Sequence, residues 1–266
     1  MKEKVKIMGI LNVTPDSFYD GGNYYDKNKA IDRAFEIAHE GADYIDIGGE
    51  STRPGSEPIS EQLEIDRVCP VIESVIKDID IPISIDTSKS AVARAALNAG
   101  AKIVNDISGL AFDEEMAGVV AKHNAGLILM HIKGTPKDMQ KNPVYDNLMG
   151  EIYHYLEDAV KKAIDSGIDE SKIIIDPGIG FGKSLEDNYI IINNLVSLTK
   201  MGYPVLIGLS RKSLIRNLYE NDVNRLPGTI SLNIISILNG AEIIRVHDVK
   251  EHKLAMDTLK MLKKVS

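Results

Sequence analysis

KIIIDPGIGFGK, residues 172–183, places a run of isoleucines directly before an acid, a proline and three glycines. The isoleucine run predicts a short buried strand that ends at Asp176. In parallel α/β proteins the carboxyl ends of the strands form the ligand-binding edge, and glycine lets a backbone approach a ligand closely. The stretch therefore predicts a ligand-binding loop that begins with Asp176.

The two common nucleotide-binding motifs do not fit this loop. A P-loop requires glycine where the chain has Pro177, and a dinucleotide fingerprint requires glycine where it has Lys183. An Asp-Pro-Gly sequence is also common in ordinary turns, so the loop alone leaves a purely structural turn open. Lys183 itself is expected to be a solvated residue in front of the next helix.

Seven further β-rich runs occur along the chain, and segments with helical periodicity separate them. Eight alternations of strand and helix predict an α/β protein with a parallel sheet and crossover helices. The count of eight favours a closed (β/α)8 TIM barrel, with an open doubly wound sheet as the alternative. No linker-like tract divides the chain, so we expect a single domain over residues 1–266. The predicted strands are Val5–Val13, Asp43–Gly48, Pro82–Asp86, Lys102–Asp106, Gly126–His131, Lys172–Asp176, Pro204–Leu209 and Glu242–His247, and later helical patterns lie near 113–124, 146–166, 186–201, 227–239 and 249–264.

The composition is typical of a cytoplasmic enzyme. Of the 266 residues, 44% are apolar and 26% are charged, which is ordinary for a globular protein. The formal net charge of -8, from 31 basic and 39 acidic residues, argues against a nucleic-acid surface. Cys69 is the one cysteine, so no internal disulfide can form and a reducing compartment is expected. No long apolar run predicts a signal peptide or a membrane span.

Nearly every predicted strand ends in polar or charged residues. A single one of these residues is weak evidence, because a threonine or an aspartate there is often a helix cap or a turn residue. A closed barrel, however, gathers all of its strand ends at one mouth. The polar residues that follow the strands include Asn12, Thr52, Arg53, Asp86, Asn105, His131, Asp176, Lys212, Ser213, Arg245 and His247.

Several of these segments resemble the motifs of the dihydropteroate synthases, enzymes of the folate pathway. GGESTRPGS and DPGIGFGK are long and specific, and the other motifs follow the family's order from Met8 to Val249. The fold of that family is the (β/α)8 barrel, which agrees with the predicted strand count. The other motifs are MGILNVTPDSF, ISIDTS, VNDISG, GLSRKS and RVHDV.

The resemblance implies a transferase with two small-molecule substrates. It would condense 6-hydroxymethyl-7,8-dihydropterin pyrophosphate with p-aminobenzoate to give 7,8-dihydropteroate and pyrophosphate. The resemblance also implies Mg²⁺ as the cofactor, carried by the pyrophosphate with Asn12 beside it. A homodimer formed through the last helices is a further implication.

The resemblance assigns residues to adjoining pockets and implies electrostatic catalysis without a covalent nucleophile. The residues assigned to catalysis are Asp86, Lys212, Arg245 and His247. The pterin pocket receives Asp86, Asn105, Met130, Asp176, Phe181, Lys212 and Arg245. The p-aminobenzoate pocket receives Thr52, Arg53, Pro54, Phe181 and Ser213, and the anion site receives Asn12, Arg53, Arg245 and His247.

Two other functions remain open at this point. A pterin-dependent methyltransferase domain shares the barrel and the pterin-edge residues, but it does not need the Ser-Thr-Arg-Pro or Ser-Arg-Lys-Ser segments that are present here. A non-catalytic pterin-binding homologue is the second alternative, and loss of Arg53, Lys212 or His247 would have indicated it. Release of pyrophosphate from both substrates distinguishes the three functions.

Overall fold

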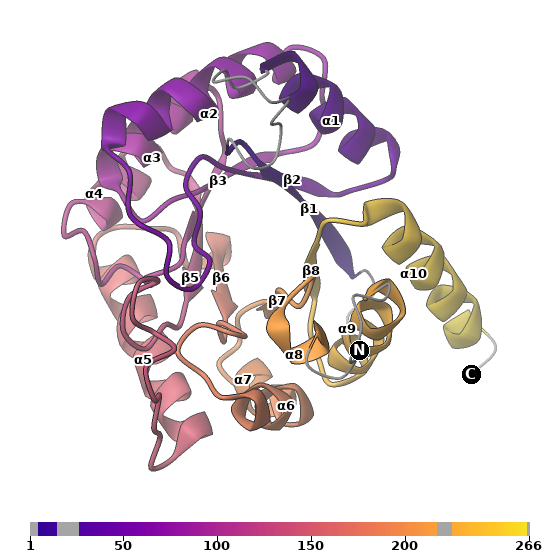
Figure 1. Cartoon of the computed structure of the whole chain (residues 1–266). Helices are drawn as coiled ribbons and strands as arrows, with labels where there is room; N and C mark the ends of the chain where they lie inside the picture. The colour runs from indigo at the N-terminus through magenta and orange to yellow at the C-terminus, as the bar shows by residue number, and fades with distance from the viewer. Residues whose placement is uncertain (1–4, 15–26, 217–224, 265–266) are drawn as a thin grey trace.

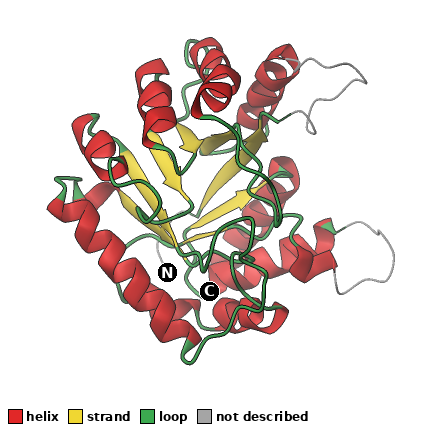
Figure 2. Ribbon diagram, turned by 60° about the vertical axis from the view of Figure 1, so that its left-hand side comes forward, coloured by secondary structure: helices red, strands yellow, loops and turns green. Residues whose placement is uncertain are grey.

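The computed structural model describes residues 5–14, 27–216 and 225–264. Its strands form the inner wall of a barrel and its helices lie outside them (Figure 1). Figure 2 shows the same two layers from the side, with the strands (yellow) surrounded by helices (red). The strands are β1 (Lys6–Asn12), β2 (Tyr44–Gly48), β3 (Ile83–Asp86), β4 (Ile103–Asp106), β5 (Gly126–Met130), β6 (Ile173–Asp176), β7 (Leu206–Ile207) and β8 (Ile243–Val246).

The helices connect successive strands, as the sequence predicted. In the described ranges, no helix combines the length and the apolar character that a membrane crossing requires. The helices are α1 (Lys27–His39), α2 (Glu61–Val75), α3 (Ser90–Ala99), α4 (Met116–Lys122), α5 (Leu148–Asp165), α6 (Leu185–Asn193), α7 (Leu195–Thr199), α8 (Ser213–Arg216), α9 (Leu226–Leu238) and α10 (Val249–Lys264), and a 3-10 turn, η2 (Glu170–Lys172), precedes β6.

Neighbouring strands are parallel, in the order β6-β5-β4-β3-β2-β1-β8-β7. The two ends of this sheet meet through an isolated bridge between Ile175 and Val205, so the barrel is nearly closed and the predicted (β/α)8 architecture is confirmed. The strand predicted over Pro204–Leu209 is shorter than expected, because only Leu206–Ile207 pairs regularly. Proline has no N–H to donate to a ladder and glycine weakens a strand, and Pro204 and Gly208 flank this pair.

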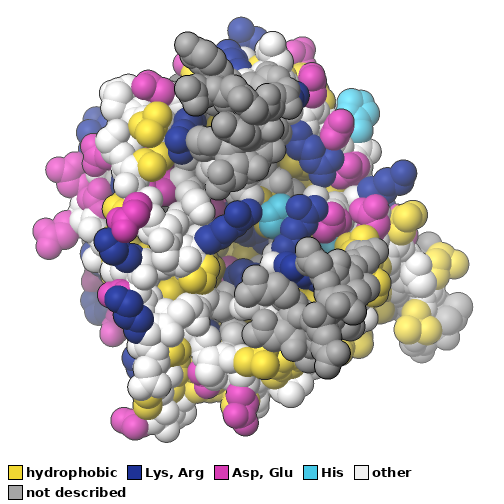
Figure 3. Space-filling model, in the orientation of Figure 1, with side chains coloured by type: hydrophobic (Ala, Val, Ile, Leu, Met, Phe, Trp, Pro, Cys, Tyr) yellow, Lys and Arg dark blue, Asp and Glu magenta, His cyan; other side chains and the backbone are white. Residues whose placement is uncertain are grey.

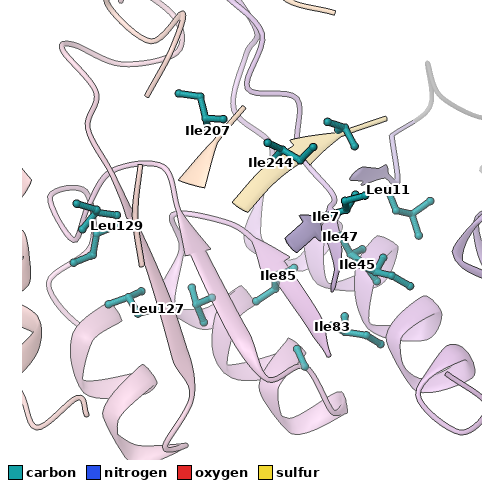
Figure 4. Packing of buried hydrophobic residues seen from close by; sticks show 14 of the residues in the cluster. Ile7, Leu11, Ile45, Ile47, Ile83, Ile85, Leu127, Leu129, Ile207 and Ile244 are labelled. Atoms are coloured by element: carbon teal, nitrogen blue, oxygen red, sulfur yellow. The ribbon is translucent and has the colours of Figure 1, made fainter. Parts of the chain in front are cut away.

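Side chains on the outer face of the strands pack against the helices. Figure 4 shows Ile45 and Ile47 on β2 and Ile83 and Ile85 on β3 within this layer. Successive strand residues point to opposite faces, so the residues between them point into the barrel. A separate apolar cluster lies there, and it contains Met8, Ile103, Ile128, Leu206 and Ile243, with Tyr44 and Ile174 packed against it.

The inward-facing positions change from apolar to polar toward the carboxyl ends of the strands. Tyr44 and Ile243 in the apolar cluster are followed two residues later by Asp46 and Arg245. The same step leads from Ile103 to Asn105. Because residues two apart share one face of a strand, each polar side chain lies directly above an apolar one. The same face of the strands therefore provides an apolar layer inside the barrel and a polar layer at its mouth, the end formed by the carboxyl ends of the strands.

Two details of the helices bear on the sequence prediction. Gly100 ends α3 with φ 120°, and a Cβ there would lie 2.0 Å from Ile76 Cδ1, so only glycine fits this helix end. The single helix predicted over 186–201 is wrong, because the chain breaks at Asn194 into α6 and α7. The Asn194 side chain donates to the Ile190 carbonyl at 2.8 Å, a local bond that competes with helix continuation.

Candidate active site

Arg245 organises the acids at the mouth of the barrel. Its Nε donates to Asp46 Oδ2 at 2.6 Å and its Nη2 donates to Asp86 Oδ2. Asn105 Nδ2 donates to the same Asp46 oxygen at 2.9 Å. Charge-assisted bonds of this kind are short and directional. The guanidinium is therefore fixed in orientation by acids from two other strands, β2 and β3.

Asp46 was not among the predicted site residues. It is fully buried in β2, and burying a charge is costly unless the charge is paired. The sequence does contain a feature that could have identified it. In Tyr-Ile-Asp-Ile-Gly, residues 44–48, the acid interrupts an apolar strand at an inward-facing position. Within the described residues, Asp46 Oδ1 and Asp86 Oδ1 are buried acceptors without a hydrogen-bond partner. They are suited to receive N–H groups from a ligand.

Burial and neighbouring charges shift the pKa values of Asp86, Asp176 and Lys212 at the mouth. Burial, with the nearby Asp46 charge, raises the pKa of Asp86 to about 7, against the opposing effect of Arg245. Burial also raises the pKa of Asp176, and Lys212 opposes that shift. Burial lowers the pKa of Lys212 to about 8. Asp86 and Lys212 therefore change charge close to neutral pH.

The glycine loop, residues 176–183, is packed against the end of β5. Asp176 Oδ1 accepts the Gly178 backbone N–H at 2.7 Å, which fixes the acid at the start of the loop. Gly178 has φ 69°, and a Cβ there would lie 1.9 Å from the His131 carbonyl oxygen. Only glycine fits a backbone conformation and an approach of this kind. The predicted ligand-binding loop is thus a rigid turn that presents Asp176 to the mouth.

The prediction that Lys183 is solvated is wrong, because its side chain is only 2% exposed. Its Nζ lies 2.8 Å from His131 Nδ1 and donates to the Phe181 carbonyl at 2.9 Å. Burial and the adjacent Lys183 lower the pKa of His131 to about 2, so the imidazole is neutral and accepts from the lysine. The pair ties the end of the glycine loop to β5.

Phe181 and Met130 form an apolar wall beside these polar groups. They belong to a small cluster with Ile107, Ile132 and Met139. Lys212 Nζ lies 4.7 Å from the centroid of the Phe181 ring, a cation–π contact, and it donates to the Ile179 carbonyl. Lys212 is thereby held between the glycine loop and the mouth.

A histidine and an asparagine form a second polar group at the mouth. His247 Nδ1 lies 2.9 Å from Ser210 Oγ, and its Nε2 lies 3.5 Å from Asn12 Nδ2. Burial, with Arg211 and Arg245 nearby, lowers the pKa of His247 to about 3. His247 therefore contributes hydrogen bonds near neutral pH rather than a positive charge.

The residues predicted for the p-aminobenzoate pocket lie at the rim. Thr52 is half-buried, whereas Arg53 and Pro54 are exposed. Within the described ranges, the Arg53 side chain makes no hydrogen bond or ion pair. Ser213 is exposed and begins α8, as predicted. The structure therefore joins Asp86, Asn105 and Arg245 in one network, but it does not bring the rim residues into contact with them.

The surface of the mouth is basic although the chain is acidic. Lys and Arg side chains gather with a histidine at the centre of the face in Figure 3, over the barrel. In the part of the chain that the structure describes, no group of three or more His, Cys, Asp or Glu side chains could hold a metal ion. A basic rim above buried acids suits a ligand with an anionic tail and an N–H-rich ring.

Comparisons with known proteins agree with this site. The family model for pterin binding enzymes matches residues 8–247. The dihydropteroate synthase of Bacillus subtilis is 47% identical over 94% of this chain and 86% of that protein, and the Clostridium beijerinckii enzyme is 46% identical over 95% and 92%. A crystal structure of the Clostridium difficile dihydropteroate synthase in the presence of pteroic acid has a TM-score of 0.91 at 42% identity, covering 98% of this chain and 97% of the other.

A second solved structure, Xanthomonas albilineans dihydropteroate synthase with 4-aminobenzoic acid, has a TM-score of 0.92 at 38% identity and covers 98% of this chain and 94% of the other. Family model, sequence relatives and solved structures thus agree over nearly the whole chain. The chain therefore belongs to the pterin-binding enzyme family and, within it, to the dihydropteroate synthases.

Proposed function

We propose that the chain condenses 6-hydroxymethyl-7,8-dihydropterin pyrophosphate with p-aminobenzoate to give 7,8-dihydropteroate and pyrophosphate. The observation that carries the proposal is the set of buried acceptors held by Arg245 at the mouth. Relatives support both substrate halves, since one was solved with pteroic acid and another with 4-aminobenzoic acid.

The acids and amides of the mouth match the polar edge of a dihydropterin. Asp176 accepts from the 2-amino group and the adjacent ring N–H, with one of its oxygens already oriented by Gly178 N–H. Asn105 donates and accepts beside it, and Asp86 accepts from another ring nitrogen. Lys212 donates to the ring carbonyl. Arg245 is held edge-on by its two acids, which leaves the flat face of the guanidinium for stacking on the ring.

The chemistry is a displacement at the exocyclic methylene carbon of the pterin. The bond from this carbon to the bridging oxygen breaks, and its electron pair leaves with pyrophosphate. The amine nitrogen of p-aminobenzoate then bonds to the carbon and loses one proton to solvent or to pyrophosphate. The carboxylates below the ring favour the positive charge that develops on it, while Arg53, Arg245 and His247 stabilise the departing anion.

The rim residues form the proposed p-aminobenzoate pocket. Thr52, Arg53 and Pro54 lie on one loop, and Phe181 provides an apolar wall. Ser213 offers a hydroxyl at the first residue of α8 to the benzoate carboxylate. These groups orient the amine toward the methylene carbon.

We propose Mg²⁺ as the cofactor, brought by the pyrophosphate. Asn12 fits this role, because its amide nitrogen faces His247 and leaves its side-chain oxygen as a ligand, and Mg²⁺ usually keeps several waters and needs few protein oxygens. When bound, the ion supplies charge neutralisation of the leaving pyrophosphate.

A homodimer and a cytoplasmic location complete the proposal. Apolar side chains of α9 and α10, including Leu238 and Leu254, are exposed, and Figure 3 shows hydrophobic side chains at the right-hand edge where Figure 1 places α10. Leu254→Glu should shift the sedimentation coefficient toward that of a monomer. The single cysteine favours a reducing compartment.

The test of the reaction is release of pyrophosphate from purified protein given both substrates and Mg²⁺, with 7,8-dihydropteroate identified by mass. Omission of p-aminobenzoate should stop the release. A methyltransferase would instead bind a methyl-tetrahydropterin and release no pyrophosphate, and a non-catalytic homologue would bind the pterin without turnover.

A further inference from the structure

The loop that carries Thr52, Arg53 and Pro54 runs from Glu50 to Ile59, and we call it the 50–59 loop. A cavity of about 210 Å³ lies beside it, and its lining includes Thr52, Asp86, Lys89 and Phe112. A void removes the packing contacts that would otherwise fix the chain around it. Packing alone therefore does not set the position of this loop.

Lys89, the residue before α3, holds both ends of the 50–59 loop. Its Nζ donates to Glu50 Oε2 at 3.1 Å and to the Ile59 carbonyl at 2.9 Å. The third bond goes to Glu64 Oε2 on α2, at 2.8 Å. An ammonium group has three donors, and here each has one partner. Glu50 closes the loop further, because its Oε1 accepts the Ile59 backbone N–H at 2.6 Å.

The charge of Lys89 also offsets the burial of Glu64. Glu64 is fully buried and, within the described residues, its Oε1 has no hydrogen-bond partner. Burial raises the pKa of Glu64, and Lys89 opposes that shift. Removal of a single partner of a buried ion pair is strongly destabilising, so Lys89→Met alone should lower stability, and a second change at Glu64 separates that loss from the loss of the loop anchor.

We infer that Lys89 is a positioning residue for p-aminobenzoate, acting through the 50–59 loop. Its three Nζ hydrogen bonds all go to protein atoms and join the loop ends to α2 and α3, and so set the position of Thr52 and Arg53 relative to Asp86. The glycine loop has its own anchors, Gly178 and Lys183, so the pterin contacts of Asp176 do not depend on Lys89. This inference rests on the proposed condensation.

The experiment compares three variants, Lys89→Met, Lys89→Met with Glu64→Gln, and Arg94→Met. The double change removes both members of the buried pair, so it restores thermal stability without restoring the loop anchor. Arg94 lies on the same helix, α3, and forms an exposed ion pair with Glu115 at 3.1 Å, so Arg94→Met is the matched control.

We expect the double variant to raise KM for p-aminobenzoate about tenfold, the equivalent of one charged hydrogen bond. KM for the pterin pyrophosphate should stay within about twofold, and the control should change neither constant. An unchanged KM for p-aminobenzoate in the stable double variant overturns the inference, as does an equal rise in both constants.

Hydrogen exchange measured by mass spectrometry gives a second readout that does not need turnover. Amides of residues 51–58 should exchange faster in the double variant, and those of the glycine loop should not. Unchanged exchange in the 50–59 loop overturns the inference whatever the activity. Absence of pyrophosphate release by the unaltered protein, with the exchange difference present, overturns the proposed function alone.

Discussion

Two loops border the same mouth but are held in different ways. The glycine loop is held by its own backbone, by the close approach of Gly178 to β5 and by the buried side chain of Lys183. The 50–59 loop is exposed at Arg53 and Pro54, lies beside a cavity, and is anchored at its ends by Lys89. The glycine loop is held by buried contacts, whereas the 50–59 loop is held by Lys89 at its ends and, at its exposed tip, by the Gly55 N–H bond to the Pro136 carbonyl at 3.0 Å and the Glu57–Lys137 ion pair at 2.9 Å.

The difference separates a preformed pocket from an adjustable one. The groups assigned to the pterin are already oriented by protein–protein hydrogen bonds, so little ordering is needed when the ring binds. The Arg53 side chain has no such partner in the described residues, and it must be ordered by the ligand. We therefore expect the pterin pyrophosphate to bind first and to complete the p-aminobenzoate pocket.

An alanine substitution in each loop is the strongest test of the difference between them. Gly178 and Gly55 both have positive φ, 69° and 81°, which strains alanine by about 1–2 kcal/mol in either place. Only at residue 178 does the new Cβ meet the His131 carbonyl, whereas nothing lies within 4 Å at Gly55. Gly178→Ala should therefore lose about 4 kcal/mol or more of unfolding free energy.

Urea denaturation measures both losses, and calorimetry with a pterin measures binding. Gly178→Ala should abolish pterin binding, while Gly55→Ala should retain it. Equal destabilisation by the two changes would show that the glycine loop is no more rigid than the 50–59 loop.

Arg53→Ala tests the anion role of the 50–59 loop. Loss of one preorganised contact to a developing anion costs about 3–4 kcal/mol of transition-state stabilisation, so kcat/KM should fall by two to three orders of magnitude. Binding of the pterin alcohol, which lacks pyrophosphate, should be unchanged by calorimetry. A collapse of pterin-alcohol binding would place Arg53 in the pterin pocket instead.

Asp176→Asn keeps the size of the side chain in the glycine loop but changes its charge and its hydrogen-bonding groups. The amide retains an oxygen for the Gly178 N–H but presents its own N–H2 to the donors of the pterin. The affinity for a pterin should fall by about 2–3 kcal/mol, the value of a hydrogen bond to a charged group. Thermal stability should be nearly unchanged, and unchanged pterin affinity would remove Asp176 from the site.

The pH dependence of pterin affinity gives the smallest expected effect. Because burial raises the pKa of Asp86 to about 7, and the charged form accepts the ring N–H, affinity should fall roughly tenfold from about pH 7.5 to about pH 6. Asp86→Asn should flatten this profile. A profile that persists in the variant would assign the titration to another group.

The stability linked to the same group changes in the opposite direction. The folded-state pKa lies above the ordinary value of 3.8, so the protonated acid favours the folded protein. Its contribution is present at low pH and is lost as pH rises through about 7. Denaturation of the Asp86→Asn variant, compared with the unaltered protein across this range, isolates the effect.

The fold was predictable because its signals are local. Alternating isoleucines and strand-end acids gave eight strands whose positions agree with the structure within a few residues, and the shorter β7 follows from Pro204 and Gly208. The break at Asn194 was missed because a side-chain bond to the preceding turn ends a helix without interrupting its apolar pattern.

The site was only partly predictable because its contacts are distant in sequence. Arg245 meets Asp46 across 199 positions, and no periodicity distinguishes an acid with such a partner from an isolated one. Lys183 was misread for the same reason, since its partner His131 is 52 positions away. The roles of Thr52, Arg53, Pro54 and Ser213 stay predictions.

The seam of the barrel, where β7 meets β6, should affect the rates of folding and unfolding. The ring is closed there by a bridge between Ile175 and Val205, and the two ends of the sheet are far apart along its strand order. The seam has one bridge, whereas the regular strand pairs of the ring match two to five residues each. Because regions with few backbone contacts open at the lowest cost, we expect the seam to close last in folding and to open first in unfolding. A bound pterin would join Asp176 on one side of the seam to Lys212 on the other. It should therefore stabilise the closed barrel, which slows unfolding and leaves the folding rate unchanged. Stopped-flow measurements with and without a pterin can detect this difference.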